Sequence, residues 1–153
     1  MLPKYHILLG FIFSAILFLI FPSINIISAG VIFLSSFLID VDHYIYYVFK
    51  KKDFSLKRAY KWFVEKNNRL SRLGPRKKRK YKFPILFFHN FELIIFLILF
   101  SLLNIIFLYI LIGFLFHLLL DYLKMIYDKD LLLLKISIIY VLITNKFKKD
   151  LKI

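Results

Sequence analysis

The stretch "ILFLIFPSINIISAGVIF", Ile16 to Phe33, decides the fold because it places a turn between two apolar segments. No charged residue occurs from Tyr5 to Ile39. The motif "FPSIN" interrupts this run with a proline and polar turn formers. We therefore predict a helical hairpin, with one helix from about Tyr5 to Phe21 and a second from about Ile26 into the region of Asp40. Each helix is near the short end of the lengths that cross a bilayer.

The overall composition points to an integral membrane protein. The 153 residues are 61% hydrophobic and 20% aromatic, whereas globular domains are about half apolar. Lys4 before an apolar run is also typical of a signal peptide, but the apolar pattern continues, so we interpret this segment as a retained span. The chain has no cysteine, which excludes disulfides and restricts any metal site to nitrogen and oxygen ligands.

The second half of the chain contains further apolar segments. The run from Phe83 to Leu123 would rise about 60 Å as one helix, twice the hydrocarbon thickness, so it has to turn. Ser101 and Asn104 mark the turn, which gives a third span from Phe83 to Leu103 and a fourth from Ile105 to Leu123. Leu131 to Thr144 is short for a crossing and predicts a re-entrant or interfacial helix. The predicted fold is an all-α membrane bundle of about four spans, in a single domain of residues 1–153.

A basic segment separates the second and third spans. Lys50 to Lys82 holds 15 of the 23 lysines and arginines, and its acids are Asp53 and Glu65. Positive loops stay cytoplasmic, so we predict a multi-pass protein of the cell membrane with this loop inside the cell. Ser55 to Leu70 reads as an amphipathic helix on the membrane surface, with Leu56, Tyr60, Phe63 and Val64 on one stripe. The segment can also bind anionic lipid headgroups or nucleic acid, and the lipid interpretation is favoured.

Histidines and acids recur at the helix ends that this topology assigns to the cytoplasmic side. Asp40 and His43 are three residues apart, as are His89 and Glu92, and His117 and Asp121 are four apart. Residues at these spacings share a helix face. His6 begins the first span, and Asp42 joins Asp40 if the helix unwinds there. Gly113 stands one turn before His117 and allows close helix approach.

Ionisable side chains at membrane depth are costly unless they are paired or bind something. Gathered carboxylates would repel one another, and a divalent cation removes that repulsion. The alternative without a metal is that these histidine and carboxylate side chains form hydrogen bonds between helices. We expect a metal site in which zinc is the first choice, with manganese, iron or magnesium as alternatives. The candidate ligands are His6, Asp40, Asp42, His43, His89, Glu92, His117 and Asp121.

Four short motifs resemble the YdjM-like family of membrane-bound, metal-dependent hydrolases. They are "YHILLG", "FLIDVDH", "FFHNFE" and "GFLFHLLLDYL", and they cover Tyr5 to about Leu123. The chain departs from the family pattern at Ile39, where a proline is usual, and in having only His89 in the central motif. The resemblance implies metal binding by His6, Asp40, Asp42, His43, His89, His117 and Asp121. Through a distant relation to zinc phospholipase C and zinc nucleases, it also implies a phosphate ester substrate.

The favoured hypothesis is a hydrolase at the cytoplasmic membrane face that uses metal-activated water on a phosphate ester or a phospholipid-type substrate. Glu92, as a ligand or general base, and Asp42 are the catalytic candidates. One alternative is a non-enzymatic membrane protein with a structural metal and a basic loop that binds lipid or nucleic acid. A second alternative is a di-iron oxidoreductase, because inward carboxylate and imidazole pairs also suit iron.

Overall fold

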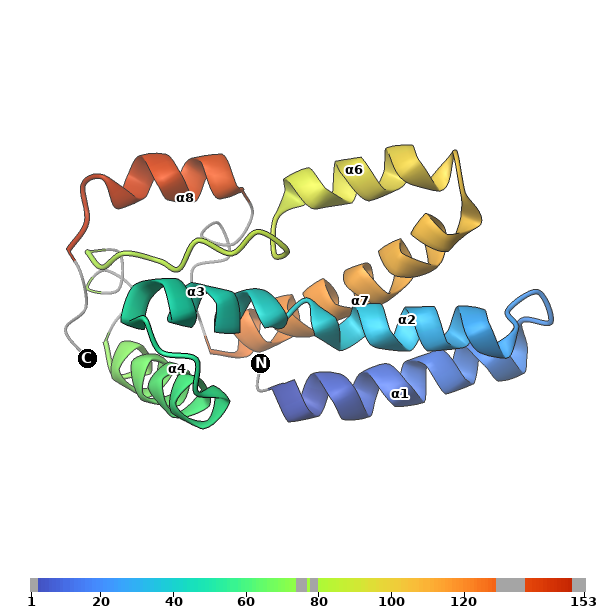
Figure 1. Cartoon of the computed structure of the whole chain (residues 1–153), viewed down its shortest axis with the longest axis horizontal. Helices are drawn as coiled ribbons and strands as arrows, with labels where there is room; N and C mark the ends of the chain where they lie inside the picture. Colours follow the sequence, from blue (N-terminus) through green and yellow to red (C-terminus); the bar gives the residue numbers. More distant parts are fainter. Residues whose placement is uncertain (1–2, 74–76, 78–79, 129–136, 150–153) are drawn as a thin grey trace. The chain divides into compact units, whose positions relative to one another are not determined.

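The described part of the chain is helical, as predicted. The computed structural model describes residues 3–73, 77, 80–128 and 137–149. In these ranges the only pairing of β type is an isolated bridge between Tyr81 and Lys149. The helices, drawn in Figure 1, are α1 (Pro3–Ile20), α2 (Ile26–Leu38), α3 (Val41–Lys51), α4 (Leu56–Ser71), α6 (Phe91–Ser101), α7 (Ile105–Tyr127) and α8 (Ile138–Asn145).

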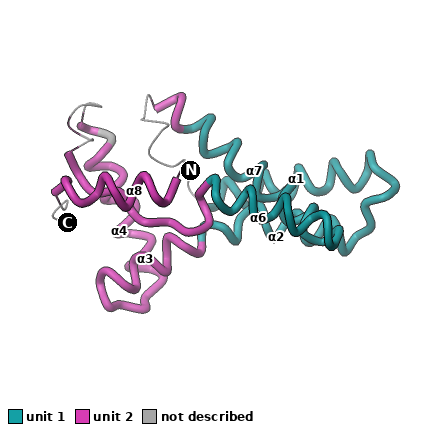
Figure 2. The backbone as a smooth tube through the Cα atoms, turned by 90° about the horizontal axis from the view of Figure 1, so that it is seen from above, with its two compact units in different colours: residues 1–40, 91–124 teal, residues 41–90, 125–153 magenta. Residues whose placement is uncertain are grey.

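The helices fall into two compact units, each made of two separate chain segments (Figure 2). Unit 1 comprises Met1–Asp40 and Phe91–Lys124, and unit 2 comprises Val41–Asn90 and Met125–Ile153. Each unit therefore closes only when an early segment of the chain meets a late one. The prediction of a single domain stays a prediction.

The hairpin of α1 and α2 in unit 1 confirms the turn predicted at residues 21–25. The backbone N–H of Phe21 still bonds to Leu17 O, at 3.0 Å, and the chain then leaves the helix at Pro22. Asn25 caps α2, because its side chain accepts a hydrogen bond from the backbone N–H of Ser28 at 2.9 Å. This cap satisfies a backbone donor that the first turn of a helix leaves unpaired.

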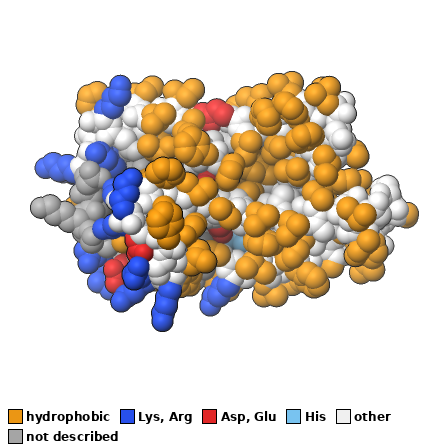
Figure 3. All heavy atoms as spheres, viewed as in Figure 1, with side chains coloured by type: hydrophobic (Ala, Val, Ile, Leu, Met, Phe, Trp, Pro, Cys, Tyr) orange, Lys and Arg blue, Asp and Glu red, His pale blue; other side chains and the backbone are white. Residues whose placement is uncertain are grey.

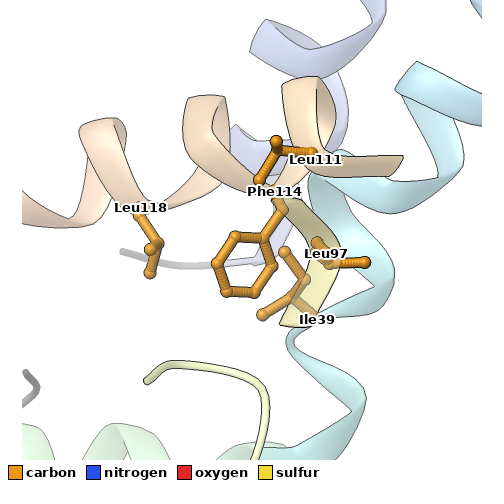
Figure 4. Packing of buried hydrophobic residues seen from close by; sticks show 5 residues of the cluster. All are labelled: Ile39, Leu97, Leu111, Phe114 and Leu118. Atoms are coloured by element: carbon orange, nitrogen blue, oxygen red, sulfur yellow. The ribbon is translucent and has the colours of Figure 1, made fainter. Parts of the chain in front are cut away.

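Apolar side chains from three helices form the core of unit 1. Phe114 of α7 is buried against Leu97 of α6 and Ile39 at the end of α2 (Figure 4). A second cluster, centred on Ile32, joins α2 to partly buried residues of α1 and α7. Phe13 of α1 also stacks on Phe116 of α7, with ring centroids 4.0 Å apart. These contacts fix α1, α2 and α7 side by side, which positions their polar residues.

The predicted third span is shorter than expected. The prediction of a helix from Phe83 was wrong: residues 82–90 are irregular, and α6 has 11 residues. Pro84 lacks an N–H donor, and the side-chain amide of Asn90 donates to Leu86 O and to Phe87 O, so helix formation is blocked until Phe91. A helix of this length rises about 16 Å, roughly half of a hydrocarbon core.

Unit 2 is built around α3 and α4, which confirms the predicted helix of the basic segment. Tyr47 of α3 is buried against Ala59 and Trp62 of α4. Elsewhere in the unit, the side chain of Asn145 at the end of α8 bonds to both backbone groups of Phe83, at 3.0 Å and 2.9 Å. α8 overlaps the second half of the short C-terminal helix predicted for residues 131–144 and ends one residue later; residues 131–136 lie outside the described residues.

Within the described residues, three helical segments are long and apolar enough to cross a membrane. They are Pro3–Ile20, Ile26–Lys51, which contains α2 and α3, and Ile105–Tyr127. Many of their large hydrophobic side chains are exposed, for example Leu19 at 79%. Hydrophobic side chains accordingly cover much of the surface visible in Figure 3. This agrees with a membrane protein, since exposed apolar patches of this extent are rare on soluble monomers.

Candidate metal site

α7 supplies two buried members of the site in unit 1. His117 and Asp121, four residues apart, are both buried, and His117 Nε2 lies 3.9 Å from Asp121 Oδ2. The other ring nitrogen, Nδ1, is 2.8 Å from the backbone carbonyl oxygen of Ser36 in α2. A carbonyl oxygen can only accept, so Nδ1 donates its proton and Nε2 carries the lone pair. A second hydrogen bond of this kind orients most metal-binding histidines.

Small residues bring α7 close enough to α2 for this bond. A Cβ at Gly113, one turn before His117, would lie 2.3 Å from the backbone oxygen of Ile32 and 2.1 Å from Ser35 Oγ. A Cβ at Gly10 of α1 would likewise lie 2.0 Å from Ser36 Oγ. The close approach predicted at Gly113 is present, and the two glycines pack both neighbouring helices tightly around Ser36.

α1 contributes His6, whose ring stacks on that of His117. The ring centroids are 3.9 Å apart and the planes differ by 17°. His6 is fully buried, and neither ring nitrogen makes a hydrogen bond within the described residues. Its Nε2 lies 3.4 Å from Asp121 Oδ1. An imidazole buried without hydrogen bonds is costly, so this ring calls for a further ligand.

Asp40, in the turn after α2, completes the unit 1 cluster of His6, Asp40, His117 and Asp121. Its Oδ1 lies 3.8 Å from His117 Nε2. Ligand atoms of His6, Asp40 and His117 all lie within 4.8 Å of one another, so the three side chains can hold a metal ion. The separations of 3.4–3.9 Å within the cluster exceed hydrogen-bond lengths. They are close to the distance of about 3.3 Å between ligand atoms around a tetrahedral ion with bonds of 2.0–2.1 Å.

A second cluster, the unit 2 cluster of Asp42, His43 and His89, lies on α3 and on the irregular segment before α6. Asp42 Oδ2 accepts hydrogen bonds from His89 Nδ1 and from the backbone N–H of Phe88, both at 3.0 Å. Both side chains are buried. The ring of His43 lies edge-on to that of His89, with centroids 4.9 Å apart. Asp42 therefore orients the imidazole of His89 through Nδ1.

The structure bears on two of the predicted helical pairs. Asp40 lies in the turn between α2 and α3, and His43 is the third residue of α3. The pairing of His89 with Glu92 on one helix was wrong, because the helix begins after His89. Glu92 lies half-buried in the first turn of α6 and belongs to no group of described side chains that can share a metal ion. The predicted catalytic role of Glu92 stays a prediction.

An open groove of ≈ 330 Å³ in unit 2 reaches Asp42. Its walls are largely apolar, with Ile45 and Phe49 of α3 facing Ile85 and Phe87. Lys50 lies at the far end, eight residues and about 12 Å along α3 from Asp42. The groove can therefore accommodate an apolar group beside a buried carboxylate.

The sequence pattern missed two features of the unit 1 cluster. One is the carbonyl of Ser36, since a backbone acceptor leaves no mark in the sequence. The other is Gly10, which lies one turn after His6, whereas Gly113 lies one turn before His117. A search for small residues one turn from each histidine would have found it. No protein-family model, curated protein or solved structure matches this chain.

Proposed function

We propose that the protein is a multi-pass membrane hydrolase that depends on a divalent metal and cleaves a phosphate ester or a phospholipid-type substrate at the cytoplasmic membrane face. The observation that carries the proposal is the unit 1 cluster. Two imidazoles and two carboxylates from three helical segments converge there, at separations that suit ligands of a common ion. The resemblance to YdjM-like hydrolases supports the same reaction class.

The donor set favours zinc. Imidazole nitrogens and carboxylate oxygens bind zinc in catalytic sites, while manganese and iron accept the same ligands. His117 has the tautomer that such a ligand needs, because Ser36 O accepts the proton on Nδ1. A bound metal would supply a water of lowered pKa and polarise the phosphate ester.

The unit 2 cluster would supply proton chemistry or further metal ligands. The carboxylate of Asp42 accepts a hydrogen bond from Nδ1 of His89 and so orients its ring. A ring held in this way can accept and return a proton or bind an ion. The groove beside Asp42 has apolar walls and a lysine at its end, a combination that suits a substrate with an apolar chain and an anionic group.

The test is the metal content of detergent-purified protein. Wild type is compared with a His117→Ala, Asp121→Asn double variant and with Ser36→Ala. The last is a matched control, because it keeps the backbone carbonyl that bonds to His117 and removes only a hydroxyl, which donates to Phe33 O within the same helix. Wild type and Ser36→Ala are expected to retain near-stoichiometric zinc, and the double variant to lose it.

Wild type and both variants are then assayed for hydrolysis of a phosphomonoester, a phosphodiester and phospholipid vesicles. Metal-dependent turnover that disappears in the double variant supports the hydrolase. Bound iron with visible absorption would point to the oxidoreductase instead. Absence of metal from wild type, even after zinc is added back, would leave the buried pairs as hydrogen-bonding contacts between helices and refute the proposal.

A further inference from the structure

Helix α4 carries two apolar faces, and packing within unit 2 accounts for only one of them. Ala59 and Trp62 are buried against Tyr47 of α3. Leu56 and Tyr60, on another side of the helix, are exposed at 68% and 50%. Phe54, just before the helix, is exposed at 77%. An outward apolar face at the start of a helix that is already packed on its other side requires a separate explanation.

Polar contacts hold the start of α4 against α3 and so determine which residues of the helix are exposed. Arg58 donates two hydrogen bonds to the carboxylate of Asp53, both at 2.6 Å, and the hydroxyl of Tyr47 donates to the same group. Ser55 caps the helix by accepting from the backbone N–H of Arg58. The start of α4 is therefore clamped to α3, and the exposure of Leu56 and Tyr60 follows from the packing of unit 2.

The charges around the outward face complement an anionic surface. α4 contains five basic residues and one acidic residue. Lys57 and Lys61 each follow an apolar residue of the outward face, so they lie about 100° further around the helix and flank that face. Apolar residues bordered by lysines are typical of helices that lie in the membrane interface.

The chain connection brings this face to the membrane surface. The candidate span Ile26–Lys51 ends five residues before Leu56. Five residues extend at most about 18 Å, so a span that ends at Lys51 keeps the start of α4 within reach of the headgroups. Nucleic acid also attracts lysines, but the chain connection and the aliphatic Leu56 favour a lipid surface.

We propose that the start of α4 inserts Phe54, Leu56 and Tyr60 into the headgroup region of an anionic leaflet, with Lys57 and Lys61 on the lipid phosphates. The inference is independent of the metal cluster. It assigns the lipid contact to the N-terminal part of α4. Phe63 and Val64, the other half of the predicted stripe, are only half-exposed, and Asn67 follows on the same side.

The absence of native cysteine allows a direct test with single-cysteine variants of the full chain. Leu56→Cys and Glu65→Cys are labelled with a polarity-sensitive nitrobenzoxadiazole dye and reconstituted in nanodiscs. Glu65 is the matched control, because it is exposed and lies nine residues, or half a rotation, from Leu56. Nanodiscs contain phosphatidylcholine alone or with phosphatidylglycerol, plus a nitroxide-bearing lipid. Emission of Trp62, the only tryptophan, is recorded before labelling to check that α4 remains packed.

In nanodiscs that contain phosphatidylglycerol, we expect the emission of the dye at position 56 to be blue-shifted relative to that of the dye at position 65. We also expect the nitroxide lipid to quench the dye at position 56 several-fold more strongly. Replacing Lys57 and Lys61 by glutamine is expected to weaken insertion roughly thirty-fold and to reduce the difference between the two lipids. Equal exposure of both positions to a water-soluble quencher, with native Trp62 emission, would overturn the proposal. Protection of position 56 by an added oligonucleotide but not by lipid would also overturn it.

Discussion

Gly113→Ala tests whether helix spacing controls the metal site. The new methyl group would lie 2.3 Å from the backbone oxygen of Ile32, whereas such carbon–oxygen contacts are normally about 3.3 Å. The serine hydroxyl nearby can rotate, but a helical carbonyl cannot, so α7 has to move from α2 by about 1 Å. The hydrogen bond from His117 to Ser36 O, now 2.8 Å, would then exceed normal hydrogen-bond lengths.

Two effects are expected from this shift. Overpacking lowers the free energy of unfolding by about 1–3 kcal/mol, and loss of the bond that orients His117 weakens metal binding about 10–100-fold. Thermal unfolding in detergent measures the first effect, and zinc competition against a chelator measures the second. Gly30→Ala is the control, because a Cβ there meets nothing within 4 Å. If Gly113→Ala binds zinc as tightly as wild type, or Gly30→Ala weakens it equally, the packing argument fails.

Three further outcomes follow from unit 2. Arg58 holds the pKa of Asp53 well below its usual range. Because the pKa of Asp53 is depressed in the folded protein, its ion pair stabilises the fold fully above the unfolded pKa of about 4, and this stabilisation is lost as the pH falls below that value. Acid unfolding followed by Trp62 fluorescence should show this loss in wild type and not in Asp53→Asn. Asp42→Asn should lower turnover about 10–100-fold without removing metal from the unit 1 cluster, as measured by kinetics beside metal analysis. Asn90→Ala leaves two carbonyls without the amide donor and should lower the free energy of unfolding by about 1–3 kcal/mol in a denaturation assay.

The sequence predicted those features that depend on local composition and spacing. The proline-containing turn at residues 21–25, the turn after Ser101 and the pair of His117 and Asp121 on one helix face are all present. These features need only apolar runs, turn formers and helix periodicity. The face of α4 that is buried was harder to predict. Ala59 and Trp62 are buried because they contact α3, and they do not belong to the most hydrophobic stripe of the helix.

The remaining errors have a common physical origin in side-chain hydrogen bonds to the backbone. The apolar residues around Phe88 favour a helix. However, Asp42 accepts a hydrogen bond from the backbone N–H of Phe88, and the side-chain amide of Asn90 donates to the carbonyls of Leu86 and Phe87. These tertiary contacts replace helical hydrogen bonds in a segment whose composition favours a helix.

The construction of unit 1 from two distant segments also sets an order of events during synthesis. His6 and Asp40 are made early, whereas His117 and Asp121 follow only after another 77 residues or more. At about 5–20 residues per second, the early pair waits roughly 4–15 s for its partners. If the cluster binds a metal ion as proposed, capture is a late step of biogenesis, and a ribosome-bound chain that stops before α7 should be unable to retain the ion there.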